Sequence, residues 1–307
     1  MSRVLVTGGA GAIGSHLVAA LVERGDDVVV LDDLSSGRRD LVPEAASLVV
    51  GAVEDSGVVE QAMAGVETVA HLAALFANQN SIEHPERDLR VSGLGTLNVL
   101  EQSRRAGVHK VLVVSSSCVY SNVELATEEA LGRVSDTPYA ITKGLVEDYA
   151  RYYASQHGMQ TVIVRPFNSY GPHEYPGPFR NVIPNFLALA MRGEELVVTG
   201  TGGETRDFTY VDDIVRGMVL ALVRPTPPGE AYNLGSGRSV RIDALAELVN
   251  ELTGNRAGYR CIQRRSWDQT MHRRASIEKA GSVLGYEPLT KLEDGLERTY
   301  AWLSSVL

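Results

Sequence analysis

Short runs of apolar, mostly β-branched residues recur through the first half of the chain. Between these runs, apolar residues return every three or four positions, as in IGSHLVAALVERG and GTLNVLEQSRRAGV. Such a period predicts helices, and each of these segments is closed by a glycine, as helices commonly are. The apolar runs themselves predict strands. They begin at Val4, Val28, Leu48, Thr68, Lys110 and Thr161.

Strands and helices are therefore predicted to alternate. Because the strands are apolar on both faces, the alternation is typical of a parallel sheet that is covered by helices on both sides. We predict an α/β fold with a doubly wound parallel sheet in residues 1–166. This sheet would form the larger of two domains.

The pattern changes after Pro166, where prolines at positions 172, 176, 178 and 184 interrupt the chain. A helix-like segment, NFLALAMRG, and two strand-like pieces, LVVTG and AYNLGSG, follow. The amphipathic segments IDALAELVNELTG and LEDGLERTYAWL predict two further helices. We therefore predict a smaller C-terminal α/β domain in residues 167–307, with later segments returning to the first domain.

The composition narrows the class of protein. The chain of 307 residues is 44% hydrophobic, enough for a sizeable core, and has a formal net charge of -9 with a sequence pI near 5.3. A net negative charge argues against binding to nucleic acid or to anionic membranes. One cluster of arginines is an exception to the net negative charge of the chain. It is either a site for an anionic small molecule or a solvated face. It comprises Arg256, Arg260, Arg264, Arg265, Arg273 and Arg274.

The two cysteines, Cys118 and Cys261, lie far apart and lack the spacing of a metal site. They fit a reducing compartment, and we expect neither a disulfide framework nor a bound metal. The N-terminal stretch MSRVLVTGGAG lacks the apolar core of a signal peptide, and no apolar run approaches the roughly 18 residues that span a bilayer. We predict a soluble cytoplasmic protein without a membrane partner.

Four glycines at positions 8, 9, 11 and 14 lie between the first predicted strand and the first predicted helix. Glycines allow a tight turn whose backbone N–H groups approach a diphosphate at the positive end of the helix. Asp32 follows about 20 residues later, at the end of the second predicted strand, where a carboxylate accepts hydrogen bonds from ribose hydroxyls. The context predicts a bound dinucleotide. Asp32 favours NAD because it would repel a 2'-phosphate, whereas Arg38 and Arg39 leave NADP open.

A second motif, PYAITK, places Tyr139 four residues before Lys143. Both residues lie on one face of a predicted helix. A nearby ammonium and a cationic nicotinamide would stabilise a phenolate and lower the tyrosine pKa from its usual value of about 10. Tyr139 is then a candidate to take the proton of a substrate hydroxyl while hydride leaves the same carbon for NAD. The run VVSSSCVY, after another predicted strand, offers a serine hydroxyl that would hold the reacting oxygen.

Together these motifs resemble the extended short-chain dehydrogenase/reductase family, in its branch of nucleotide-sugar epimerases and dehydratases. The resemblance covers essentially the whole chain and is closest in pattern to UDP-glucose or UDP-glucuronate 4-epimerases. It rests on TGGAGAIG, LDDLSSG, HLAA, GTLNVLE, SSSCVY, YAITK, RPFNSYGP, TRDFTYVDD, YNLGSG and LGYEP. It implies a Rossmann-type sheet, NAD as cofactor and a nucleotide sugar as substrate. It also implies a homodimer formed through the helices at GTLNVLE and YAITKGLVEDYARYYA.

The resemblance assigns roles to individual residues. Ser116, Tyr139 and Lys143 match the catalytic residues, with Ser117 as the fallback for Ser116. Besides Tyr139 and Lys143, the residues implied to bind the cofactor are Gly8, Gly11, Ala12, Ile13, Gly14, Asp32, Asp33, Ser36, Gly37, Ala52, Val53, Leu72, Ala73, Ala74, Ser92 and Pro166. Those implied to bind the nucleotide sugar are Ser116, Ser117, Tyr139, Asn168, Arg180, Asn181, Val182, Val197, Arg206, Arg265 and Asp268.

Some positions depart from the family pattern. Ala52 stands where the family often has an aspartate for the adenine amino group, and Ser92 stands where many relatives have an asparagine near the nicotinamide. Neither change removes a catalytic group. Sugar dehydratases and some decarboxylases have acidic residues after the catalytic serine or threonine, because eliminating water needs extra acid and base groups. Here those positions are Ser117 and Cys118, which counts against 4,6-dehydration.

A 4-epimerase needs only a base, a hydroxyl that holds the reacting oxygen, NAD, and room for a 4-keto sugar to turn over. We therefore predict an isomerase, an NAD-dependent 4-epimerase of a UDP-hexose. The pairs UDP-glucose/UDP-galactose and UDP-glucuronate/UDP-galacturonate stay open, because Arg180 would contact either a carboxylate at carbon 6 or a hexose hydroxyl. The alternatives are an NAD-dependent nucleotide-sugar decarboxylase or dehydratase and a catalytically silent NAD-binding regulator. Intact Ser116, Tyr139 and Lys143 argue against the silent regulator.

Overall fold

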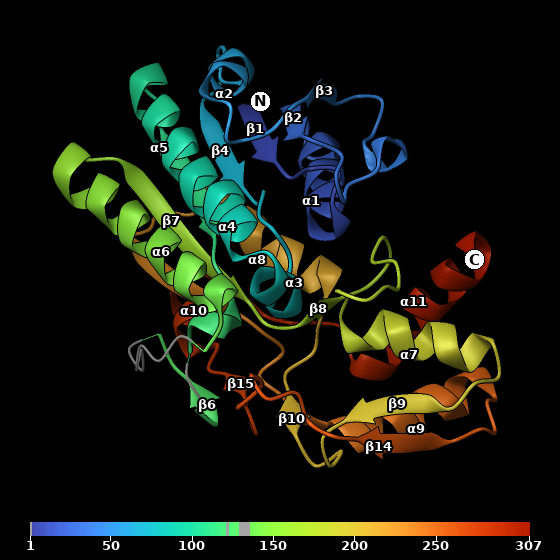
Figure 1. Cartoon of the computed structure of the whole chain (residues 1–307). Coiled ribbons are helices and arrows are strands. Elements are labelled where there is room, and N and C mark those ends of the chain that lie inside the picture. Colours follow the sequence, from blue (N-terminus) through green and yellow to red (C-terminus); the bar gives the residue numbers. More distant parts are fainter. Residues whose placement is uncertain (1, 121–122, 129–135) are drawn as a thin grey trace.

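The computed structural model describes residues 2–120, 123–128 and 136–307. Its centre is a sheet of seven parallel strands in the order β12-β7-β5-β4-β1-β2-β3 (Figure 1). The six strands predicted from the apolar runs all belong to this sheet. The strands are β1 (Arg3–Thr7), β2 (Asp27–Asp32), β3 (Ser47–Val50), β4 (Thr68–His71), β5 (Lys110–Val114), β7 (Gln160–Pro166) and β12 (Glu230–Leu234).

Helices cover both faces of the sheet, because successive side chains of a strand point to opposite sides. In β1, Val4 and Val6 share a buried cluster with side chains of α1 and α8, whereas Leu5 shares the opposite cluster with α2, α5 and α6. The predicted α/β fold with a doubly wound, Rossmann-type parallel sheet is thereby confirmed. These helices are α1 (Ala12–Glu23), α2 (Ser56–Ala62), α5 (Gly95–Ala106), α6 (Pro138–His157) and α8 (Val211–Val223).

The strand order reverses between β1 and β4. From β1 the chain adds β2 and β3 on one side, then returns to add β4, β5, β7 and β12 on the other. At such a point the connections leave opposite faces of the sheet and open a crevice outside the carboxyl ends of the strands. The glycine loop follows β1, and residues 72–77 follow β4, so both stretches lie at this crevice.

The C-terminal part carries smaller elements, which lie in the lower half of Figure 1. Four two-stranded sheets occur within the described ranges. They pair β6 (Leu125–Ala126) with β15 (Arg274–Ala275), β8 (Ser169–Tyr170) with β11 (Thr209–Tyr210), β9 (Leu196–Thr199) with β14 (Tyr259–Ile262), and β10 (Thr205–Arg206) with β13 (Val240–Arg241). The helices of this part are α7 (Val182–Met191), α9 (Ile242–Thr253), α10 (Glu278–Leu284) and α11 (Leu292–Val306).

Short helical elements connect the strands, and those that follow β4 in the chain contribute residues to the crevice. They are the 3-10 turns η1 (Arg39–Leu41) and η3 (Ser117–Val119), the helices α3 (Asn78–Glu83) and α4 (Pro85–Asp88), and the π-helical turn η2 (Leu89–Leu94). Helix α3 packs against α6, and η2 lies between α4, α5 and α6. Among all the helices described, none is long and apolar enough to cross a membrane.

The piece AYNLGSG follows the predicted domain boundary in the sequence but joins the large sheet. It contains most of β12, which joins the edge of the large sheet with Tyr232 opposite Val164. Residues 231–234 of this strand are buried, and a strand of the covered parallel sheet provides burial on both faces. Later segments thus return to the first domain, while the boundary at residue 166 stays a prediction.

Candidate active site

A cleft of about 320 Å³ lies where the crevice meets the segment after β7. It brings together stretches that are far apart in the sequence: the glycine loop, the ends of β2, β4 and β5, the start of α6, and the loop that precedes α7. Most residues predicted to bind the cofactor line it. They are Gly8, Gly11, Ala12, Ile13, Gly14, Asp32, Asp33, Ser36, Gly37, Ala52, Val53, Leu72, Ala73, Ala74, Tyr139, Lys143 and Pro166.

The glycine loop requires glycine at two of its positions. Gly8 has a φ of +70°, and a Cβ there would lie 2.8 Å from the backbone nitrogen of Ala73. A Cβ on Gly14 would collide with the carbonyl oxygen of Gly8. The loop therefore leads directly into α1. The first backbone N–H groups of this helix have no hydrogen-bond partner within the helix. This arrangement fits the diphosphate of a dinucleotide.

Asp32 is buried at the end of β2 and holds the neighbouring loops. Its Oδ2 accepts a hydrogen bond from the backbone N–H of Ala10 at 3.0 Å, and its Oδ1 accepts one from Leu34 at 2.9 Å. Burial raises the pKa of Asp32, although these two backbone hydrogen bonds oppose the rise. Each carboxylate oxygen has a second acceptor site, so Asp32 can still bind ribose hydroxyls.

Arg38, which left NADP open, already has partners. It donates two hydrogen bonds to Asp40, at 3.0 and 2.8 Å, and its guanidinium lies 4.9 Å from the ring centroid of Tyr175. A guanidinium that is paired in this way offers less to a 2'-phosphate. The observed contacts agree with the preference for NAD that Asp32 predicts.

Tyr139 occupies the first turn of α6, and local chemistry fixes that turn. Thr137 is the N-cap, and its Oγ1 accepts a hydrogen bond from the backbone N–H of Ala140 at 3.2 Å. Pro138 stands at the first helical position, where a missing N–H has no cost. The N–H of Tyr139 donates to Oγ of Ser81 at 3.0 Å. The position of the phenol thus depends on α3 as well as on α6.

Lys143 lies one turn further along α6, as the sequence predicts. Its ammonium is 5.7 Å from the ring centroid of Tyr139 and donates a hydrogen bond to the carbonyl oxygen of Val114 at 2.8 Å. Burial lowers the pKa of Lys143 to about 8, while the negative charges of Asp88 and Glu147 oppose the fall. The lysine is therefore held close to the tyrosine at the end of β5.

Burial also raises the pKa of the Tyr139 phenol, against the hydrogen bond with Ser116, which lowers it. Burial outweighs this hydrogen bond, so the pKa of the phenol lies above its usual value. The positive charges of Lys143 and of a bound nicotinamide would both oppose this rise. Ser116, Tyr139 and Lys143 all line the cleft, and Ser117 does so too.

A buried ion pair lies behind the serine run. Arg165 in β7 donates to both carboxylate oxygens of Glu147 in α6, at 2.7 Å each, and Ser115 donates to the same carboxylate at 2.6 Å. Burial alone would raise the pKa of Glu147, but Arg165 outweighs it and holds this pKa below its usual value. The pair ties together β5, β7 and α6 directly beside Ser116 and Lys143.

The loop before α7 forms the other wall of the cleft. Asn168, Arg180 and Asn181 line it, as predicted for the nucleotide-sugar site. Asn181 donates a hydrogen bond to Glu174 at 2.8 Å. Burial raises the pKa of Glu174 to about 7, against hydrogen bonds from Asn181 and the positive charge of Arg180. Arg180 itself forms no salt bridge with any residue in the described ranges, although its charge acts on Glu174.

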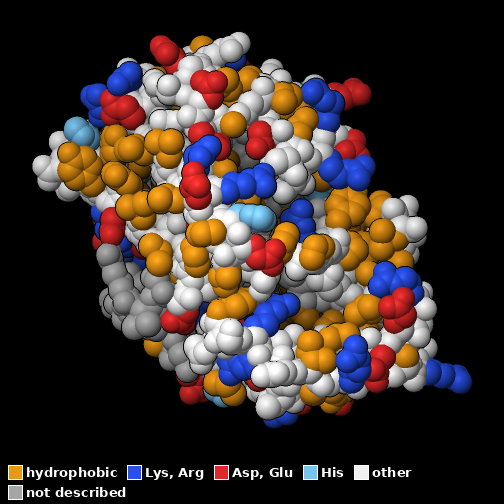
Figure 2. Space-filling view, viewed as in Figure 1, with side chains coloured by type: hydrophobic (Ala, Val, Ile, Leu, Met, Phe, Trp, Pro, Cys, Tyr) orange, Lys and Arg blue, Asp and Glu red, His pale blue; other side chains and the backbone are white. Residues whose placement is uncertain are grey.

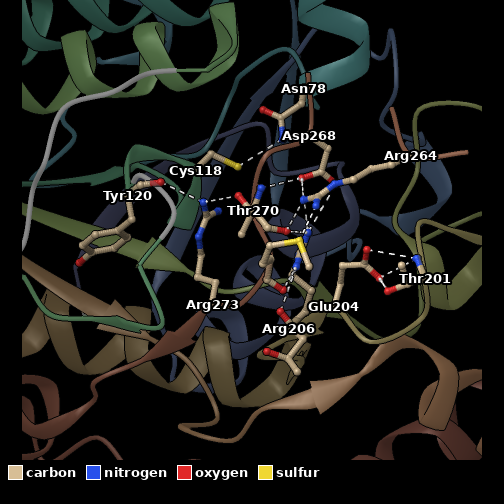
Figure 3. A network of polar contacts seen from close by, with 12 residues as sticks. Asn78, Cys118, Tyr120, Thr201, Glu204, Arg206, Arg264, Asp268, Thr270 and Arg273 are labelled. Carbon is tan, nitrogen blue, oxygen red and sulfur yellow. Dashed lines mark hydrogen bonds and ion pairs between the residues drawn. The ribbon is translucent and has the colours of Figure 1, made fainter. Parts of the chain in front are cut away.

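The remaining predicted substrate residues do not line this cleft. Arg206 and Asp268 lie beside it in a polar network that Figure 3 shows together with Cys118 and Asn78. Nη2 of Arg206 is 3.5 Å from Asp268, and Nη2 of Arg264 is 3.7 Å from it. Val182 is the first residue of α7, Val197 lies in β9, and Arg265 is exposed next to the network.

Ser92 is placed differently from the prediction. It is buried in η2 and does not line the cleft. Its hydroxyl accepts a hydrogen bond from the backbone N–H of Leu75 at 3.1 Å and donates to Asp88 at 3.3 Å. Through these contacts Ser92 supports the segment after β4, and its contact with the nicotinamide stays a prediction.

Sequence reasoning missed Glu174, Asn78 and Ser81. Glu174 and Asn78 line the cleft, and Ser81 is buried beneath it against Tyr139. No periodicity marks these positions, because they lie in irregular loops or in a helix of six residues. The one signal for Glu174 is its place between the motifs RPFNSYGP and FRNVIP.

The fold and the cleft define an α/β enzyme that uses a dinucleotide, and comparisons with known proteins give the family. The model of the NAD dependent epimerase/dehydratase family matches residues 4–235. The solved structure of an epimerase from Methanothermobacter thermautotrophicus is 43% identical, with a TM-score of 0.96, and the match covers 99% of this chain and 92% of that chain. A UDP-glucose 4-epimerase from Thermotoga maritima, solved with UDP-glucose, is 33% identical, with a TM-score of 0.95 and coverage of 99% of both chains.

A relative with a different activity matches as well. UDP-glucuronic acid decarboxylase 1 of Xenopus tropicalis is 34% identical over 97% of this chain and 71% of its own length. The chain therefore belongs to the NAD dependent epimerase/dehydratase family, and the predicted resemblance is confirmed. Its cofactor is NAD.

Proposed function

We propose that the chain is an NAD-dependent 4-epimerase of a UDP-hexose. The observation that carries the proposal is the joint placement of Ser116, Tyr139 and Lys143 on one wall of the cleft, with Ser117 and Cys118 at the next two positions. This set supplies a base and a hydroxyl for oxidising one carbon. It supplies no carboxyl group beside that serine for a further elimination.

Three side chains would act in the reaction at carbon 4. Ser116 would hold the oxygen at carbon 4, and Tyr139 would take its proton and later return it. Lys143 would stabilise the phenolate by its charge. Bound NAD supplies the acceptor and donor of hydride at carbon 4. Because the 4-keto sugar must present its other face before it is reduced, the cleft wall made by the loop before α7 would have to release the hexose briefly.

Acidic side chains in the cleft bear on the choice between reactions. Among the described residues that line it, these are Asp32, Asp33 and Glu174. Asp32 and Asp33 lie at the end of β2, next to the glycine loop, and Glu174 is hydrogen-bonded to Asn181 on the opposite wall. None of the three occupies the two positions directly after Ser116, which are Ser117 and Cys118 here and acidic in dehydratases of the family. This favours epimerisation over dehydration, and decarboxylation is the runner-up because decarboxylases are among the relatives.

Arg180 bears on the choice between two classes of hexose. Its guanidinium lines the cleft and lacks an ion pair among the described residues, so it is available to a carboxylate at carbon 6. A neutral hexose would instead offer it a hydroxyl. If Arg180 binds a carboxylate, Arg180→Ala should lower turnover of UDP-glucuronate at least about tenfold more than turnover of UDP-glucose. Equal losses would remove the role in binding a carboxylate.

We also propose that the protein is a homodimer through α5, α6 and η2. Large hydrophobic side chains are exposed on this side, which lies at the left of Figure 2. They include Leu89, Leu94, Ile141 and Tyr152. Light scattering should give twice the 33.2 kDa of one chain, and Ile141→Glu should give a single chain. Val223→Glu, at an exposed position of α8, is the matched control. A monomeric wild-type protein would contradict the proposal.

Proton NMR of the sugar region tests the reaction. The purified protein is incubated with NAD and with UDP-glucose or UDP-glucuronate in parallel, and Tyr139→Phe is the control. New signals with the small coupling of an equatorial hydrogen at carbon 4 are the expected result, and their relative rates identify the preferred sugar. A pentose or dehydrated product, or unchanged spectra for both sugars, would overturn the proposal.

A further inference from the structure

We propose that Trp267 and Gln79 are positioning residues that link the nucleotide end of the site to Tyr139. This inference rests on the proposed function, because it concerns how that site is assembled. Its basis is one contact between two segments that are 188 positions apart. The indole N–H of Trp267 donates a hydrogen bond to Oε1 of Gln79 at 2.9 Å. Gln79 belongs to α3, and Trp267 belongs to the loop between β14 and β15.

On one side of this contact, Trp267 lies between two residues predicted to bind the nucleoside diphosphate. The guanidinium of Arg265 is 5.7 Å from the centroid of the indole ring. Asp268, the next residue, is held by Arg206 and Arg264 in the network of Figure 3. A diphosphate that engages these arginines, or a ribose that engages Asp268, would therefore fix the segment on which Trp267 stands.

On the other side, α3 contacts the start of α6 through two hydrogen bonds. Oδ1 of Asn78 accepts a hydrogen bond at 2.8 Å from Thr137, the N-cap of α6. Oγ of Ser81 accepts one at 3.0 Å from the backbone N–H of Tyr139, and Ser81 is fully buried. Asn78 also donates to Cys118 at 3.4 Å, beside the serine run. Any displacement of α3 thus acts on Tyr139 and on the segment after β5.

Helix α3 has only six residues, and a helix of this length is not stable by itself. Its position depends on the groups that hold it. Trp267 supplies one of these groups from the C-terminal part of the chain. Binding of the nucleotide at one end of the site would therefore order α3, and α3 would hold Tyr139 in place for proton transfer at the other end.

Steady-state kinetics test the link. Trp267→Phe keeps an aromatic ring but removes the N–H, and Gln79→Ala removes the acceptor. Each should lower kcat about fivefold, the effect of one neutral hydrogen bond, and the double variant should lose no more than either single variant. Gln269→Ala is the matched control, because Gln269 is exposed in the same loop and, among the described residues, its side chain bonds only to Ser266. A rise in KM at unchanged kcat would show a role in binding alone and would overturn the proposal.

Hydrogen–deuterium exchange supplies a readout that does not need turnover. Addition of UDP to the NAD-loaded protein should slow exchange in residues 136–145, at the start of α6. In Trp267→Phe this protection should be largely lost, and in Gln269→Ala it should be kept. Equal protection in the wild-type protein and Trp267→Phe would refute the link. Absence of epimerisation with the expected exchange pattern would refute the proposed reaction and leave the link standing.

Discussion

Replacing Glu174 with glutamine measures how much the buried carboxylate charge at this position lowers the free energy of unfolding. Only 6% of this residue is exposed, and burial raises its pKa from 4.5 to about 7, although Asn181 and Arg180 oppose the rise. A tenfold change in proton affinity is worth about 1.4 kcal/mol. The ionised carboxylate therefore destabilises the folded protein by roughly 3 kcal/mol at alkaline pH.

The sign follows from proton linkage. The folded protein binds the proton of Glu174 more tightly than the unfolded chain does. The residue therefore contributes stability that is present below pH 4.5 and is lost as the pH rises through about 7. Glutamine has no such proton and nearly the same size. From pH 5 to pH 8.5, Glu174→Gln should gain about 2–3 kcal/mol in free energy of unfolding relative to the wild-type protein.

Urea unfolding at both pH values, followed by circular dichroism, is the assay. Glu44→Gln is the matched control, because Glu44 is exposed. The control should show the same stability difference from the wild-type protein at pH 5 and at pH 8.5. If Glu174→Gln also shows no change between the two pH values, burial of Glu174 does not raise its pKa and the reasoning fails.

Three further substitutions test the site. Gly14→Ala should weaken NAD binding at least about tenfold in calorimetry, because its Cβ would collide with the carbonyl of Gly8 and displace the diphosphate loop. Glu147→Gln should lower the free energy of unfolding by about 3 kcal/mol in urea, because it leaves the buried charge of Arg165 without its counter-ion. Tyr139→Phe should reduce kcat by about 10² or more while NAD binding is retained, since the phenol carries the proton and other groups bind the dinucleotide.

Matched controls separate local from general effects. Gly281→Ala, where a Cβ meets nothing closer than 3.5 Å, should leave NAD affinity unchanged. Asp148→Asn changes a half-exposed carboxylate on the same helix as Glu147 and should cost under about 1 kcal/mol. Tyr149→Phe should keep wild-type turnover. If a control variant changes NAD affinity, stability or turnover as much as its test variant does, the corresponding prediction is contradicted.

Much of the cofactor site could be predicted because its signals are local. Gly8, Gly14 and Asp32 lie in one βαβ unit, where the spacing alone places them at the same sheet edge. Tyr139 and Lys143 likewise share one helix. The sequence pattern did not show that β12 belongs to the large sheet. Its pairing with β7 joins residues about seventy positions apart, and apolar pattern alone does not specify a partner strand.

The hydrogen bonds that support the site could not be predicted from the sequence, because they too join segments that are far apart in the chain. Ser81 holds the backbone of Tyr139 and Gln79 meets Trp267, yet neither residue type marks a motif at these positions. The placement of Ser92 was likewise not foreseen: it is buried in η2, where its hydroxyl bonds to Leu75 and Asp88. Side-chain length and the path of irregular segments decide such contacts, and neither is encoded in periodicity.

The most direct test of the proposed reaction follows the hydrogen at carbon 4. UDP-glucose carrying deuterium at this carbon is incubated with the protein and NAD in ordinary water, and the product is analysed by NMR and mass spectrometry. We predict UDP-galactose that keeps its deuterium, because hydride removed from carbon 4 is held on the cofactor and returned to the same carbon. A galacto-configured product with solvent hydrogen at carbon 4, or a dehydrated product that has lost a hydroxyl group, would contradict the 4-epimerase mechanism.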